Sequence, residues 1–121
     1  MVHKGDGPVK RLEARFFRLA SGREPVRDWL LELERADRKV VGDDIRTVEI
    51  GWPIGMPLCR SLGGYKGLWE IRSNLTGGRI ARVLFCVKGD ALVLLHGLIK
   101  KTQKTPEHDL KLASRRMKGL S

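Results

Sequence analysis

The order of apolar and polar positions along the chain predicts four strands. Residues 10–16 alternate apolar and charged side chains, which is typical of a strand with one buried face. Three further strand-like runs cover residues 67–72, 79–87 and 91–98. Because the segments between these three runs are short and contain glycine, asparagine or aspartate, the runs are expected to form an antiparallel meander.

Three helices are predicted from helical spacing and from residues typical of helix ends. The first begins at Pro25, after which apolar residues share one stripe at Val26, Trp29, Leu30 and Leu33. Asp37 is expected to cap a second helix, which Gly51 ends. Thr105 and Pro106 are expected to be the N-cap and first-turn proline of a third helix, which ends near residues 118–119.

This element order predicts an α+β fold: strand, two helices, three strands and a C-terminal helix, with the helices packed on one face of a twisted, mainly antiparallel sheet. Residues 1–8 are polar and contain glycine, so they are expected to form a flexible tail before a single domain over residues 9–121. Residues 51–67 contain five glycines and two prolines and are expected to be a long irregular loop.

Charge narrows the class of partner. The chain has 24 Lys and Arg against 14 Asp and Glu, a net charge of +10. Residues 24–49 hold eight acids and five bases, so this segment has a charge of 5 − 8 = −3 and the remainder carries 10 + 3 = +13. A basic surface separate from an acidic helical pair indicates a polyanionic partner such as RNA.

Several other classes are disfavoured. No apolar run approaches the roughly 20 residues of a membrane span, and the N-terminus lacks the apolar stretch of a secretory signal, so a cytoplasmic protein without a membrane partner is expected. The two cysteines, Cys59 and Cys86, lack metal-ligand spacing and are expected to be free thiols, and the three histidines are scattered. We therefore expect neither a metal nor another cofactor.

Lysines and arginines near the last strands are the best candidates for phosphate contacts. Lys100, Lys101 and Lys104 follow the last strand and precede a helix N-terminus, where charge and backbone N–H groups can bind an anion together. Arg72 and Arg82 lie on strands, where arginine is unexpected unless that face of the sheet is open to solvent or ligand. The alternative for the lysines is a solvated charge run, and for the arginines an exposed strand surface.

Five further positions can contribute to an RNA site. His96 is either a partly buried structural histidine or a proton carrier, and Tyr65, in the glycine-rich loop beside Lys66, can stack on a base or pack. Arg115 and Arg116 belong to a basic face of the last helix, which either follows a nucleic-acid backbone or is a solvated surface.

Two motifs resemble a known family: Trp-Glu-Ile-Arg at residues 69–72, and His-Gly-Leu-Ile-Lys-Lys-Thr-Gln-Lys-Thr-Pro at residues 96–106. With residues 79–85 they are similar to the HigB-type, phage-derived branch of the RelE/ParE toxin superfamily, over most of residues 9–118. The resemblance implies a RelE-like fold and a toxin held inactive by a cognate HigA-type antitoxin. It also implies metal-free endoribonuclease activity on mRNA at the translating ribosome, with attack by the ribose 2′-hydroxyl on the adjacent phosphorus.

The same resemblance suggests roles for individual residues. Arg72 and Arg82 match strand arginines that contact the scissile phosphate. The three lysines named above match substrate clamps or a proton-transfer group, and His96 and Tyr65 are secondary acid or base candidates. Two other functions stay open: non-enzymatic inhibition of DNA gyrase, as in the ParE branch, and accessory nucleic-acid binding without toxicity.

Overall fold

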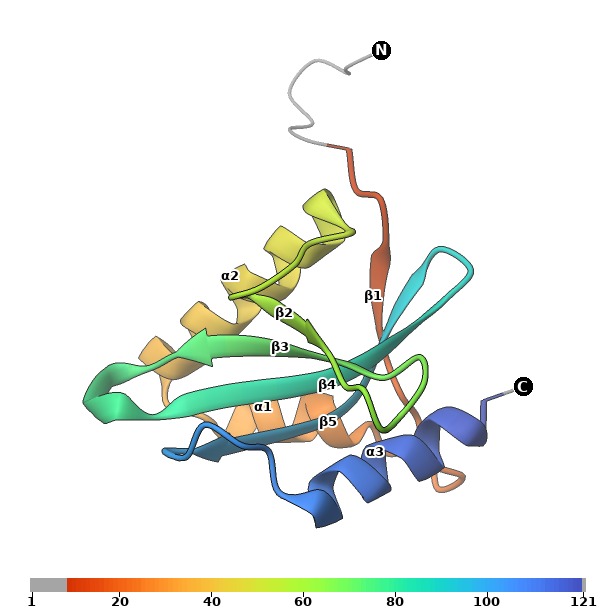
Figure 1. The fold of residues 1–121 in the computed structure, drawn as a ribbon. Coiled ribbons are helices and arrows are strands. Elements are labelled where there is room, and N and C mark those ends of the chain that lie inside the picture. The colour runs from red at the N-terminus through yellow and green to blue at the C-terminus, as the bar shows by residue number, and fades with distance from the viewer. Residues whose placement is uncertain (1–8, 121) are drawn as a thin grey trace.

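A mixed five-stranded sheet forms the middle layer of the protein, and the computed structural model describes it within residues 9–120 (Figure 1). The strand order is β1-β5-β4-β3-β2. Strands β3, β4 and β5 form the predicted antiparallel meander, while β1 pairs with β5 in parallel. The predicted tail over residues 1–8 lies outside the described residues. The strand bounds are Glu13–Phe16 for β1, Cys59–Ser61 for β2, Trp69–Asn74 for β3, Ile80–Lys88 for β4 and Ala91–Lys100 for β5.

Three α-helices and one short 3-10 helix complete the fold over the described residues. Helix α1 spans Pro25–Glu32, α2 spans Arg35–Gly51, α3 spans Glu107–Lys118, and η1 spans Thr76–Gly78. The predicted N-cap residues are wrong for two helices. Asp37 lies inside the first turn of α2, which follows Glu34, and α3 follows Pro106, because the Thr105 side chain is bonded elsewhere.

Helices cover both faces of the sheet, so the prediction that they pack on one face is wrong. Val83 and Phe85 of β4 point to the face covered by α1 and α2, where they share a core with Val26 and Val41. Leu84 points to the opposite face and packs in a second core with Ala113 of α3, and the ribbon shows α3 on the side of the sheet away from α2 (Figure 1). The central strands are therefore buried on both sides.

The loop predicted over residues 51–67 contains a short edge strand that the sequence did not reveal. Strand β2 pairs with only the first half of β3, from Cys59 opposite Ile71 to Ser61 opposite Trp69. Beyond this point the Arg72 N–H still donates to the Leu58 carbonyl at 2.8 Å, and the rest of β3 forms a sheet edge. The second half of β3 therefore lies at the border of the sheet.

Close packing fixes α1 against β5. At Gly97, a Cβ atom would lie only 2.6 Å from Cζ3 of the Trp29 ring, which is closer than Cβ contacts allow. The indole of α1 therefore rests directly on the backbone of β5, and only glycine fits at this position.

Candidate phosphate-binding site

Arg72 and Arg82 lie directly opposite each other on β3 and β4. Residues paired across strands share a face, and Leu84, two residues along β4 from Arg82, belongs to the core under α3. Both arginines therefore belong to the α3 face. The Arg72 guanidinium donates to Glu70 Oε2 at 2.7 Å and to the Gln103 carbonyl at 3.0 Å. Two guanidinium groups from adjacent strands are thus brought together beside the segment that follows β5.

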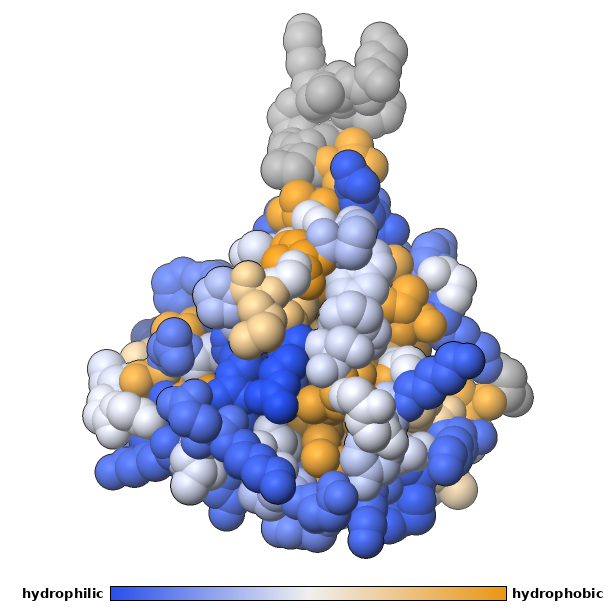
Figure 2. All heavy atoms as spheres, in the orientation of Figure 1, coloured by the Kyte–Doolittle hydropathy of each residue, from blue (hydrophilic) through white to orange (hydrophobic). Residues whose placement is uncertain are grey.

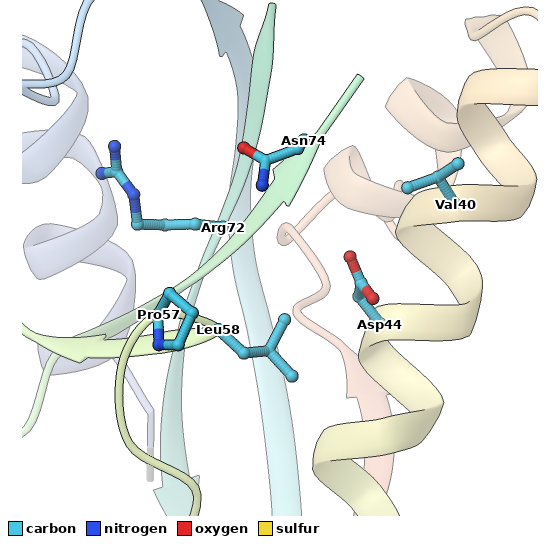
Figure 3. A pocket seen from close by; sticks show the side chains of 6 residues that line it. All are labelled: Val40, Asp44, Pro57, Leu58, Arg72 and Asn74. Atoms are coloured by element: carbon cyan, nitrogen blue, oxygen red, sulfur yellow. The ribbon is translucent and has the colours of Figure 1, made fainter. Parts of the chain in front are cut away.

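A pocket of about 330 Å³ opens beside Arg72, between β3 and α2 (Figure 3). Asp44 and Val40 line it from α2, while Arg72 extends away from α2 toward the α3 side. The Asp44 carboxylate accepts a hydrogen bond from Ser73 at 2.7 Å. The side chain of Arg72 is 12% exposed, and a strongly hydrophilic patch covers this part of the surface over β3 (Figure 2). Solvent therefore reaches Arg72 at the uncovered edge of β3.

Arg82 is completely buried, so the alternative of an exposed strand surface is wrong for this residue. Its Nη2 donates to the Thr102 carbonyl, and its Nε and Nη1 have no hydrogen-bond partner within residues 9–120. Burial lowers the pKa of the Arg82 guanidinium, and the positive charge of Arg72 lowers it further. The result is a buried cation with two unused donors, covered by residues 101–105.

Glu70 is the counter-ion of this site and was missed by the sequence analysis. The Glu70 carboxylate is fully buried, and it accepts the Thr105 hydroxyl at 2.6 Å as well as Arg72. The alternation of the Trp-Glu-Ile-Arg run was the available signal, because it places Glu70 and Arg72 on the same face of β3. Thr105 ties the start of α3 to the sheet, which explains why its hydroxyl does not cap the helix.

The lysine motif contributes backbone to the site. Lys100, Lys101 and Lys104 are exposed, and the groups that reach Arg82 and Arg72 are the carbonyls of Thr102 and Gln103. The three exposed lysines are close neighbours of these two carbonyls along the chain. Their side chains are therefore accessible to an anion in solution. The guanidinium groups of Arg72 and Arg82 are instead bonded to the backbone of residues 102–103.

His96 is held by α3. Its Nε2 lies 2.6 Å from Asp109 Oδ1, and His108 Nε2 lies 3.2 Å from the other carboxylate oxygen of Asp109. On the sheet, His96 pairs with Leu84, two residues along β4 from Arg82. The side chain is 18% exposed, so His96 is partly buried, and its contact with Asp109 joins β5 to α3.

Tyr65 borders a pocket of about 230 Å³ next to the arginines, which also contains Arg60 and Lys104. The Tyr65 hydroxyl donates to Glu107 Oε2 at 2.9 Å. Burial raises the pKa of Tyr65, and the hydrogen bond and charge of Glu107 raise it further. Lys66 is exposed on the same loop. Tyr65 is thus fixed in the wall of this pocket, while the side chain of Lys66 extends into solvent.

The two arginines of α3 do not form one basic face. Arg115 is exposed, but Arg116 Nη1 donates to the Leu95 carbonyl at 2.8 Å and its guanidinium lies 5.7 Å from the centre of the Phe17 ring. Burial lowers the pKa of Arg116, with a further contribution from Arg115. Arg116 therefore packs α3 against the sheet, at the end of the helix away from Thr105.

Within residues 9–120, the side chains of His, Cys, Asp and Glu nowhere gather in a group of three that could hold a metal ion. No helix in this part of the chain is long and apolar enough to cross a membrane. The side chains at the candidate site carry guanidinium, ammonium, carboxylate, imidazole and hydroxyl groups.

Comparison with protein families identifies a family that this chain matches. The sequence model of the family described as "Phage derived protein Gp49-like (DUF891)" matches residues 28–118, a range that includes every candidate site residue. A search of curated proteins gave no match.

Proposed function

This chain belongs to the family of Gp49-like phage-derived proteins, and from that membership we propose that it is a type II toxin that cleaves mRNA on the ribosome. The family is a RelE/HigB-like toxin family and is associated with toxin-antitoxin systems. The observation that carries the proposal is the Arg72–Arg82 pair with two unused donors on Arg82. A buried guanidinium with unused N–H groups is costly for the fold and suits an anion that arrives later.

In the proposed reaction, the ribose 2′-hydroxyl attacks the adjacent phosphorus as the bond from phosphorus to the 5′-oxygen breaks. The products are a 2′,3′-cyclic phosphate and a 5′-hydroxyl. The proton of the 2′-hydroxyl passes to a base, and the departing 5′-oxygen takes a proton from an acid; Lys100, Lys101 and His96 are the candidates. Arg72 and Arg82 stabilise the negative charge that develops on the non-bridging oxygens.

Binding of RNA requires residues 101–104 to release the arginines. In the described structure, the Thr102 and Gln103 carbonyl oxygens accept the hydrogen bonds that two phosphate oxygens would take. The exposed lysines of the segment can meet the RNA backbone first, since they need no rearrangement. Ordering of the substrate by the ribosome would then supply the in-line geometry of the 2′-hydroxyl.

The direct test is growth arrest on induction, followed by mapping of new mRNA 5′ ends. New ends inside translated codons are expected for the wild type and not for Arg82→Met. Arg46→Ala, which removes an exposed arginine from α2, is the matched control and should cut like the wild type. Growth arrest without new mRNA 5′ ends would contradict the proposed nuclease function.

The burial of Arg82 also favours a second candidate function, in which the toxin inhibits DNA gyrase by protein contact and needs no accessible catalytic arginine. A supercoiling assay with purified gyrase separates the two functions. Inhibition that survives Arg82→Met, together with intact mRNA, would support gyrase inhibition.

Membership of the family suggests an antitoxin partner. We infer that the antitoxin docks an acidic amphipathic segment in a groove of about 260 Å³ formed by β1, α1 and α2. Phe16 and Leu30 line the groove, Leu31 is 54% exposed, and Arg27 and Arg38 supply positive charge. Leu31→Asp should prevent co-purification with the antitoxin, whereas Leu19→Asp, at another exposed leucine, should not. Equal recovery of the complex would exclude this groove.

A further inference from the structure

The pocket beside Tyr65 has the volume and the lining residues expected of a site that binds one flat ring. Its volume of about 230 Å³ lies below the roughly 300–1,000 Å³ typical of sites for drug-sized ligands. Leu62 and Leu110 give it apolar surface, and Arg60, Lys104 and Glu107 give it polar groups. This combination of apolar surface with a few fixed polar groups is what a nucleobase requires.

The pocket lies next to the proposed phosphate site. Arg60 pairs across β2 and β3 with Glu70, the residue that holds Arg72. Neighbouring strands are about 4.8 Å apart, so the pocket begins one strand beyond the arginine on β3. Lys104 also lines the pocket, and it directly follows Gln103, whose carbonyl accepts a hydrogen bond from Arg72. A base in the pocket would therefore belong to a nucleotide close to the phosphate between the arginines.

The polar group that can read the base is Glu107. The Tyr65 hydroxyl holds Glu107 Oε2 at 2.9 Å, while Oε1 has no hydrogen-bond partner in the part of the chain that the structure describes. An ionised carboxylate only accepts hydrogen bonds. Guanine offers two adjacent donors, N1–H and N2–H, on its Watson–Crick edge. Uracil offers one donor between two carbonyl oxygens, which a carboxylate repels.

We propose that this pocket binds a guanine base of single-stranded RNA beside the cleaved phosphate, and that Glu107 is the residue that selects it. Arg60 and Lys104 bind the flanking backbone phosphates, and the leucines contact the ring. This proposal rests on the proposed RNA-binding function. The preference for one base over another, however, depends on the pocket alone.

Two glycines provide a steric test of the pocket. A Cβ atom added at Gly63 or Gly64 would meet no atom within 4 Å, so alanine fits the fold at both positions. Because both residues line the pocket, Gly64→Ala narrows it without changing the carboxylate. It should weaken the binding of a large purine base more than that of uracil.

The experiment has two arms, cleavage and binding. Mapped cuts should show guanine next to the cut for the wild type, and Glu107→Gln should reduce that preference about tenfold, as expected for loss of a bidentate contact. Glu32→Gln, an exposed carboxylate on α1, is the matched control and should leave the preference unchanged. In the second arm, purified protein is titrated with short single-stranded RNAs that differ by guanine or uracil at one position.

The two arms separate this inference from the proposed reaction. Binding that favours guanine and depends on Glu107, without any cleavage, would support the pocket and remove the nuclease. Cleavage with the same base preference in the wild type, Glu107→Gln and Gly64→Ala would overturn the pocket and keep the nuclease. RNA binding that does not distinguish guanine from uracil would overturn the pocket as well.

Discussion

Arg82→Met exchanges a buried guanidinium for an apolar side chain that extends into the same space. The exchange removes one hydrogen bond, from Nη2 to the Thr102 carbonyl, and with it two donors that have no partner in the described residues. It also removes the repulsion from Arg72, while the attraction to Glu70 is lost. The balance of these terms decides the sign of the change in stability.

The magnitude follows from the burial of Arg82. A hydrogen bond from a charged group contributes about 1.5–3 kcal/mol, whereas each unsatisfied buried donor costs about 1–3 kcal/mol. Because Arg82 has two such donors and no exposure, a relief of about 2–6 kcal/mol stands against a loss of about 1.5–3 kcal/mol, and from the middle of these ranges we expect Arg82→Met to stabilise the fold by about 2 kcal/mol. Toxicity should disappear, since loss of one oxyanion-stabilising donor lowers rates about 10²–10³-fold.

Urea unfolding followed by tryptophan fluorescence measures the stability, and the mapping of RNA ends measures the activity. Arg72→Met provides the contrast, because Glu70 is buried against Arg72 and would lose its counter-ion. That variant should be destabilised by about 3–5 kcal/mol. If Arg82→Met instead destabilises the protein by more than about 1 kcal/mol, the guanidinium is a structural group and the argument for a phosphate site fails.

Three other predictions concern the fold. Gly97→Ala forces a Cβ atom into the ring of Trp29 and should destabilise the protein by about 1–3 kcal/mol in urea unfolding; wild-type stability would contradict this packing. The hydrogen bond from Arg79 lowers the pKa of Asp37, so this pair stabilises the fold above the unfolded pKa of about 4 and loses that effect as pH falls through the lower folded pKa. Asp37→Asn should therefore destabilise the protein at neutral pH but not at the lowest pH, and a pH-independent difference would refute the coupling. Burial raises the pKa of Cys59 to about 11, so iodoacetamide at pH 8 should label it only after unfolding, as mass spectrometry can show.

The sequence predicted the elements that have a strong period. The apolar stripe from Val26 to Leu33 and the long apolar runs of β4 and β5 correspond to α1 and to the central strands. Strand β2 has three residues among glycines and prolines, which is too short for alternation to be visible. The predicted position of α3 was wrong, although the sequence contained a signal. Residues Val83 to Cys86 are all apolar, which is typical of a strand covered on both faces.

The candidate site was also predicted only in part from the sequence. Arg72 and Arg82 were identified because arginine is unusual on a strand, but their environment depends on contacts between distant residues. Thr105 and Glu70 are 35 positions apart in the sequence. No local pattern predicts that the Thr105 hydroxyl donates to the Glu70 carboxylate and does not cap the helix that follows it. Burial of Arg82 likewise depends on where residues 101–105 lie after β5, which alternation along a strand does not encode.

The parallel pairing of β1 with β5 has a consequence for how the chain folds. Within residues 9–120, β1 pairs only with β5, so β1, α1 and α2 are synthesised before the strand with which β1 pairs. Pairing over so long a loop is slow compared with the folding of helical bundles. Until β5 is in place, the apolar stripes of α1 and α2 are exposed to other chains. We therefore expect the yield of folded protein from refolding to fall as protein concentration rises, and fragments that end before β5 to aggregate.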